Sequence, residues 1–165
     1  MTAGDRLGPG QLAVYFALME SSSLLQYAVE QQLRRDGDLS FVQFQILAGL
    51  NFHPDGRQRM TDIADRVVYS RSGVTYQVRE LEKRGHVERL ADPDDERGTV
   101  VAITTAGRGL VDTVLPGHQE VVREMLLDHL GEKDAATLTR LLGTLRDRMR
   151  EQPPRSAAPR GRITR

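Results

Sequence analysis

The residues of this chain with the clearest chemistry lie in the segment RMTDIADRVVYSRSGVTYQVRELEKRGHVERL, residues 59–90. Between about Ser70 and Arg84, the spacing of Val74, Val78 and Leu81 predicts a helix with a single apolar stripe. A helical wheel places hydrogen-bonding side chains on the opposite side, with Lys83 further along: Ser72, Thr75, Tyr76 and Arg79.

These side chain types match the edges of base pairs. The guanidinium of Arg79 can bridge two acceptors of a guanine or take a phosphate, and Ser72 and Thr75 can donate to base edges or phosphate. Ser70 and the helix amino terminus offer N–H groups to a phosphate oxygen, and Arg71 suits backbone charge. The predicted major-groove set is therefore Ser70, Arg71, Ser72, Thr75, Tyr76 and Arg79. The alternative is a solvated face on a winged-helix module that binds protein.

A hairpin follows this helix. Residues 86–90 and 99–103 are rich in valine, isoleucine and threonine, which predicts two short strands joined by the turn ADPDDERGT. Arg97 is the one basic residue among four acids there. An arginine held out on a hairpin by a carboxylate can enter a narrow minor groove, and Asp95 is the expected orienting partner. The alternative is an acidic, solvated turn that Arg97 only neutralises.

The remaining elements would position this segment. A short helix after Met60, with Thr61 as its cap, followed by a tight turn and the longer helix has the layout of a helix-turn-helix. Ser40 would cap a helix through Leu50. Long helices are expected over 11–35, 105–130 and 132–150. The terminal helices carry more apolar surface than the middle can cover, which predicts association with a second copy of the chain.

Composition excludes several classes of protein. The 165 residues suit one compact domain, and the balance of 23 Lys and Arg against 23 Asp and Glu argues against a histone-like binder. Lys and Arg still outnumber Asp and Glu by eight to five over residues 57–90. Without cysteine there is no disulfide or zinc–thiolate site. A secretory signal is absent and apolar runs are short, so we expect a cytoplasmic protein without a membrane span.

Catalysis and metal binding are not expected. The chain has four histidines, on different predicted elements and never spaced by three or four residues, so no metal is predicted. Ser70, Ser72 and His86 lack an orienting acid and an oxyanion site, and no glycine-rich phosphate loop is present. We therefore expect no enzymatic activity and no cofactor.

Four stretches together resemble the MarR family of bacterial regulators: LSFVQFQIL, MTDIADRV, SRSGVTYQVRELEKRGHVER and DPDDERGTVVAITTAGR, between Leu39 and Arg108. The resemblance implies a mainly α (α+β) fold, a winged helix-turn-helix lobe with long N- and C-terminal dimerisation helices. Residues 1–10 would be a flexible start, 11–150 a single domain and 151–165 a disordered basic tail. Within the domain, 11–37 and 105–150 would dimerise and 39–104 would bind DNA.

The resemblance also implies function. It predicts a homodimer that binds a pseudo-palindromic operator in double-stranded DNA and represses transcription until a small ligand releases it. Residues 70–79 would enter the major groove, with Asp95 and Arg97 as the wing pair. Glu96 departs from the basic or neutral residues often found at this wing tip, which would weaken its contacts.

A small aromatic effector is a further implication of the resemblance. It would bind between the dimer helices and the DNA lobe, although aromatic and aliphatic residues at helical spacing are more often plain core than a pocket. No lysine or arginine lies between Leu7 and Leu33, which favours a neutral or cationic compound with Glu20 or Glu30 as partner. The residues expected in the ligand pocket are Tyr15, Phe16, Met19, Phe41, Phe44, Leu47, Leu115 and His118.

Overall fold

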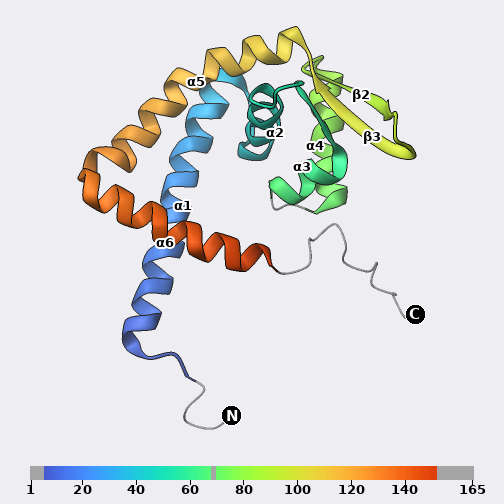
Figure 1. Ribbon diagram of the computed structural model, residues 1–165. Coiled ribbons are helices and arrows are strands. Elements are labelled where there is room, and N and C mark those ends of the chain that lie inside the picture. Colours follow the sequence, from blue (N-terminus) through green and yellow to red (C-terminus); the bar gives the residue numbers. More distant parts are fainter. Residues whose placement is uncertain (1–5, 68–69, 152–165) are drawn as a thin grey trace, which may run out of the picture.

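A computed structural model describes residues 6–67 and 70–151, except for the side chains of Glu96 and Arg97. The described chain is mainly helical with one small sheet, which confirms the expected fold class (Figure 1). The elements in order are α1 (Pro9–Gly37), α2 (Phe41–Asn51), β1 (Arg57–Arg59), α3 (Met60–Arg66), α4 (Arg71–Lys83), β2 (Val87–Asp92), β3 (Asp95–Ile103), α5 (Thr105–Met125), η1 (Leu127–His129) and α6 (Glu132–Arg150).

The ends of the helices follow local chemistry. The hydroxyl of Ser40 accepts from the Gln43 amide at 3.3 Å, and the Gln43 side chain accepts from the Ser40 amide at 3.0 Å, a reciprocal cap that starts α2 as predicted. Gly85 has a φ of +73°, so the chain turns after α4 in a conformation that glycine adopts without strain. α5 contains Pro116, and the helix expected to reach residue 130 ends at Met125, followed by the single 3₁₀ turn of η1.

The sheet has the strand order β1-β3-β2, antiparallel throughout. Strand β1 was not predicted, and its residues Arg57 and Arg59 pair with Ala102 and Val100 of β3. The hairpin strands extend further toward the turn than expected, and an irregularity in register falls between Ala91 and Asp92.

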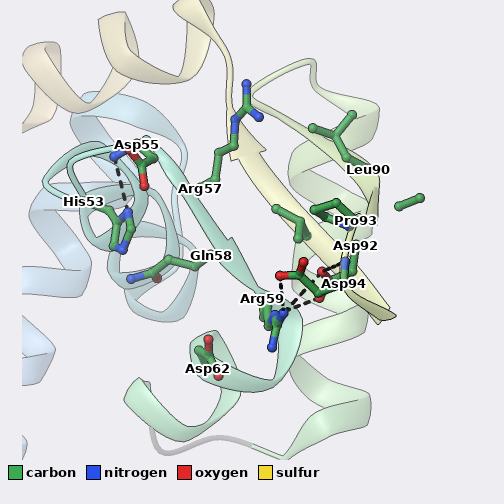
Figure 2. Close-up of a pocket in the computed structure, with 12 residues that line it drawn as sticks. His53, Asp55, Arg57, Gln58, Arg59, Asp62, Leu90, Asp92, Pro93 and Asp94 are labelled. Atoms are coloured by element: carbon green, nitrogen blue, oxygen red, sulfur yellow. Dashed lines mark hydrogen bonds and ion pairs between the residues drawn. The ribbon is translucent and has the colours of Figure 1, made fainter. Parts of the chain in front are cut away.

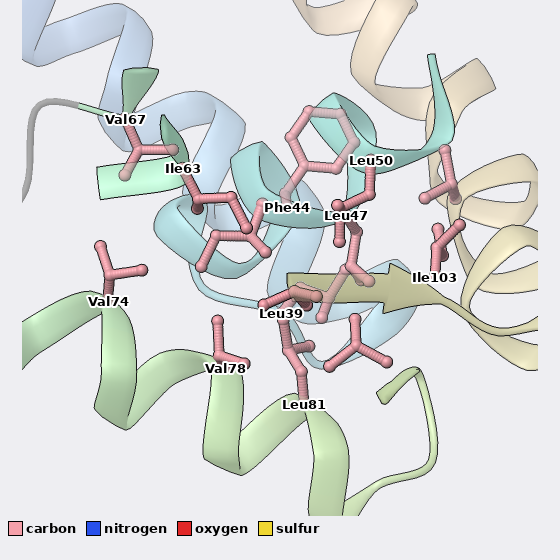
Figure 3. Packing of buried hydrophobic residues seen from close by; sticks show 14 of the residues in the cluster. Leu39, Phe44, Leu47, Leu50, Ile63, Val67, Val74, Val78, Leu81 and Ile103 are labelled. Carbon is pink, nitrogen blue, oxygen red and sulfur yellow. The ribbon is translucent and has the colours of Figure 1, made fainter. Parts of the chain in front are cut away.

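One core lies under the helix-turn-helix and joins it to the sheet. Side chains from α4 point toward α2 and α3 and meet Leu47 and Ile63 (Figure 3). This packing fixes which face of α4 is turned outward. The fully buried residues include Leu39, Ile46, Leu47, Leu50, Ile63, Val74, Val78, Leu81, Val101 and Val111.

The terminal helices are largely uncovered in the single chain. In Figure 1 the N-terminal half of α1 extends away from the lobe, and every residue from Pro9 to Leu24 is exposed. None of the residues of α6 is buried. By length and composition α1 would be able to cross a membrane, and among the described residues it is the one helix that passes this test. The short apolar runs did not predict this result. A helix that is covered by other protein passes the same test, so the length and composition of α1 do not by themselves indicate a membrane span.

Candidate nucleic-acid interface

Helices α3 and α4 form the predicted helix-turn-helix. They are joined by a short connection whose residues 68 and 69 lie outside the described part of the chain. The hydroxyl of Ser70 caps α4 by accepting from the Gly73 amide at 3.2 Å. Thr61 does not cap α3 as expected. The cap position is Arg59, whose side chain makes no capping hydrogen bond.

The outward face of α4 carries every predicted major-groove residue. Tyr76 is 60% exposed, and Ser70, Arg71, Ser72 and Arg79 are exposed as well. Thr75 is half-buried. Its hydroxyl donates to the Arg71 carbonyl at 2.9 Å, which leaves the oxygen lone pairs and the methyl group for a ligand.

Two arginines of this face are unpaired within the described residues. Arg71 and Arg79 make no side-chain hydrogen bond or ion pair with any residue that the structure describes. Further along the helix, Lys83 donates to Glu80 at 2.7 Å, and this contact raises the pKa of the Lys83 ammonium. Arg71 in the first turn and Arg79 further along α4 are thus available to a ligand, whereas the ammonium of Lys83 at the end of the helix is engaged.

Ion pairs and hydrogen bonds of arginine side chains join α4 and α3 to neighbouring elements. Arg89 of β2 contacts Glu82 at 2.8 Å, which fastens the hairpin to the helix. Arg84 donates to the carbonyls of Asp38 at 2.8 Å and Gly37 at 3.3 Å, so the end of α4 is joined to the end of α1. Within α3, the Arg66 guanidinium donates to the Gln45 carbonyl of α2 at 2.9 Å.

The hairpin of β2 and β3 projects beside the helix-turn-helix as the predicted wing (Figure 1). Asp95 lies at the tip and has an interaction partner. The side chain of Arg97 lies outside the described residues, so the predicted pairing of Asp95 with Arg97 stays a prediction.

An ion-pair cluster beside the wing turn, at the end of β2, was not predicted. Arg59 Nε donates to Asp92 Oδ2 at 2.7 Å, and Arg59 Nη2 donates to Asp94 Oδ2 at 3.1 Å (Figure 2). The Asp92 side chain is only 3% exposed. The cluster borders an open groove of about 690 Å³ between β1, the start of α3 and β2. The sequence offered one signal for it, an arginine where a helix is normally capped by a small polar residue.

The residues predicted for an effector pocket fall into two groups. Phe44 and Leu47 belong to the core, Phe41 and Leu115 pack against it, and the rings of Phe44 and His118 lie 4.6 Å apart. The other group lies exposed on the N-terminal half of α1, where Tyr15 and Phe16 contact each other edge to face: Tyr15, Phe16 and Met19. The single chain does not bring the two groups together.

Polar atoms without partners lie near the buried group. Gln32 is almost fully buried, and its amide donates to the Val114 carbonyl at 3.0 Å and to Asp36 at 2.9 Å. Gln32 Oε1 and His118 Nδ1 are buried without a hydrogen-bond partner among the residues that the structure describes. Burial lowers the pKa of the His118 imidazole, so this ring is neutral near pH 7. Of the predicted effector partners, Glu30 is paired with Arg34 at 2.7 Å, and Glu20 is exposed.

Known proteins share this sequence pattern and fold. The sequence model of the MarR family matches residues 37–98. The HTH-type transcriptional regulator MhqR of Bacillus subtilis is 28% identical over 131 residues, which cover 79% of this chain and 88% of that protein. The HTH-type transcriptional repressor YetL of the same organism is 25% identical over 140 residues, covering 85% and 83% of the two chains.

Solved structures of two Streptomyces coelicolor proteins are similar over nearly the whole chain. Sco3205, a MarR family transcriptional regulator in complex with DNA, superposes with a TM-score of 0.84 at 28% identity, covering 93% of this chain and 95% of that one. AbsC, a MarR family transcriptional regulator, gives a TM-score of 0.83 at 26% identity, covering 89% and 99%. The likeness therefore includes the terminal helices as well as the winged lobe.

Proposed function

Because the chain belongs to the MarR family, we propose that it regulates transcription by binding an operator in duplex DNA as a homodimer, as a repressor released by a small ligand. The observation that carries the proposal is the outward face of α4. It is exposed, begins at a capped amino terminus and holds, beside hydroxyl groups, two arginines that have no partner in the described part of the chain.

The roles within α4 follow from position. Arg71 and Ser72 lie in the first turn, where free N–H groups and the helix dipole favour a phosphate. Thr75 and Arg79 are four residues apart and share one face, so both can reach base edges along a groove. Tyr76 presents a phenol hydroxyl and a ring on the same exposed surface.

Dimerisation is supported by the uncovered terminal helices. The N-terminal half of α1 is apolar around most of its circumference, and in a water-soluble protein a helix of that kind is normally covered by other protein surface. Helix α6 adds an unburied stripe of Leu141, Leu142, Leu145 and Met149. A second copy of the chain is the proposed cover, with 11–37 and 105–150 as dimerisation regions and 39–104 as the DNA-binding lobe. Symmetry would then require two half-sites in inverted repeat, roughly 34 Å apart.

The wing supports a second contact, in the minor groove next to each half-site. We place Asp95 and Arg97 there, at the turn between β2 and β3. Acidic residues crowd this turn and repel phosphate, so a single inserted arginine is a better fit than a broad basic surface.

An effector would act through the helices that carry the lobe. Buried Phe44 and the unpartnered Nδ1 of His118 offer an aromatic wall and a polar atom, and α1 of a second copy would supply the exposed aromatic residues. Arg84 joins the end of α4 to the end of α1, so a ligand that moves α1 would also move the recognition helix. As a DNA-bound regulator the protein would act in the cytoplasm.

Selection of genomic fragments on the purified protein, followed by a salt titration, tests the proposal. A dimer that neutralises several phosphates should lose affinity steeply, with a slope of about −0.9 per contact on logarithmic axes. The selected fragments should share an inverted repeat. A flat salt response with no shared sequence would favour the alternative, a winged-helix module that binds protein.

Enzymatic activity is not proposed. Ser70 serves as the cap of α4, and burial lowers the pKa of the His86 imidazole, whose Nδ1 has no hydrogen-bond partner over residues 6–67 and 70–151. Turnover of a substrate that stopped on changing Ser70 or His86, with the fold retained, would contradict this part of the proposal.

A further inference from the structure

The ion pair between Arg59 and Asp92 joins two elements that are far apart in sequence. Arg59 ends β1 and stands directly before α3, the first helix of the helix-turn-helix. Asp92 ends β2, at the base of the wing turn. Arg59 Nε contacts Asp92 Oδ2 at 2.7 Å, and Arg59 Nη2 contacts Asp92 Oδ1 at 3.4 Å, so the guanidinium meets the carboxylate through two nitrogens (Figure 2).

Asp92 also shapes the turn itself. Its Oδ1 accepts from the Asp94 amide at 3.0 Å, a side-chain turn that fixes the backbone where the hairpin reverses. A carboxylate that is 3% exposed needs a partner, and Arg59 is the one cation that contacts it among the described residues. The conformation of the turn and the position of Arg59 are therefore coupled.

Two features show that the local sequence is adapted to this pair. An arginine at the cap position of α3 places a positive charge at the positive end of the helix dipole, and its side chain leaves the helix amides uncapped. On the opposite strand, Gly98 leaves the space that the carboxylate fills. A Cβ at this position would lie 2.6 Å from Asp92 Cβ and 2.9 Å from its Oδ2.

From these contacts we infer that the Arg59–Asp92 pair is a latch that holds the wing at a fixed orientation relative to the helix-turn-helix. Arg59 and Asp92 are positioning residues, since they act on DNA through the wing and not by touching it. Of the two arginines that line the groove beside the latch, Arg59 is the one engaged with carboxylates among the described residues. The inference rests on the proposed function for its effect on DNA, but the latch itself can be tested without DNA.

Hydrogen exchange of the free protein tests the latch directly. In Arg59→Ser, which restores an ordinary cap residue, amides of residues 92–99 should exchange at least about tenfold faster, while those of α4 keep their protection. Gly98→Ala should loosen the same amides although it removes no charge, because the added methyl displaces Asp92. Arg57→Ser is the matched control. It removes an arginine two residues away on β1 that has no partner among the described residues, and wing exchange should not change.

A DNA titration separates a latch from a phosphate contact. Arg59→Ser should weaken binding to the selected operator about tenfold or more, with the salt slope unchanged. Loss of a phosphate contact would instead reduce the slope by about 0.9. Unchanged wing exchange in Arg59→Ser, or equal effects in Arg57→Ser, overturns the latch. If wing amides exchange faster in Arg59→Ser but the unaltered protein binds no DNA, the latch is supported and the proposed function is contradicted.

Discussion

Replacing Phe16 by alanine should weaken the dimer while leaving the winged lobe intact. Phe16 lies on the exposed half of α1, and 61% of its surface is open to solvent in the single chain. An aromatic side chain buries about 200 Å² when fully covered, so a partner could cover about 120 Å² of this one. At about 25 cal/mol per Å², covering that area stabilises by about 3 kcal/mol.

Symmetry doubles the effect, because each copy contributes one Phe16. Alanine retains about a third of the contact, so the dimer should lose about 4 kcal/mol, which corresponds to about a thousandfold in the dissociation constant. This is an upper value, since it assumes complete coverage in the dimer.

Subunit dissociation can be measured by sedimentation of a fluorescently labelled sample over a dilution series. Phe52→Ala provides a matched control, because Phe52 is 67% exposed but lies on the loop after α2, within the winged lobe. Phe16→Ala should be monomeric at concentrations where Phe52→Ala is still dimeric. Equal dissociation constants for the two variants would show that the exposed half of α1 is not the interface.

Three further predictions concern DNA contact, packing and pH. Arg79→Ala should lower specific operator affinity by about 1–3 kcal/mol, whereas Lys83→Ala, whose ammonium is engaged by Glu80, should change it much less; equal losses on every DNA sequence would reassign Arg79 to a phosphate. Gly49→Ala places a methyl group against the Arg66 guanidinium and should lower the free energy of unfolding by about 1–3 kcal/mol, as measured by chemical denaturation. Gly109→Ala has open space around the added methyl group and should raise the same free energy by about 0.5–1 kcal/mol. Burial lowers the pKa of His118, so the unfolded chain binds a proton at this residue more readily than the folded chain does. The free energy of unfolding should therefore be highest above about pH 6.5 and fall as the pH drops toward the folded-state pKa. His118→Gln should flatten this pH dependence in urea titrations at fixed protein concentration.

Local sequence signals were enough to predict the recognition helix. The spacing of Val74, Val78 and Leu81 predicted its buried face and a helix from about residue 70 to 84, and the structure has α4 over Arg71–Lys83 with these three residues buried. Each signal acts within about one helical turn, so it needs no knowledge of the rest of the chain. The exposed face of α4 follows from the buried one, which explains why its candidate residues could be named in advance.

The contact between β1 and the wing turn could not be predicted in the same way. Strand β1 is the tripeptide Arg-Gln-Arg, which has no apolar alternation and exists only because it pairs with residues 100–102 of β3. Cap preferences favoured Thr61, but Arg59 takes the cap position and forms its ion pair with Asp92, 33 residues away. Asp95 was chosen as the orienting acid because it lies two residues before Arg97, and nothing local in the sequence distinguished the buried Asp92 from its three neighbouring acids.

The effector residues show a different limit, because part of their surroundings belongs to a second chain. Phe44 and His118 meet inside one copy, whereas Tyr15 and Phe16 have no cover within it. If α1 is covered by the partner, these exposed rings complete a site only in the dimer, and affinity for an effector must depend on protein concentration. Within each copy, Arg84 ties the lobe to α1, and the core ties α4 to α2 and α3. The lobe should then move as one body, so that an effector would change the distance between two recognition helices without distorting either of them.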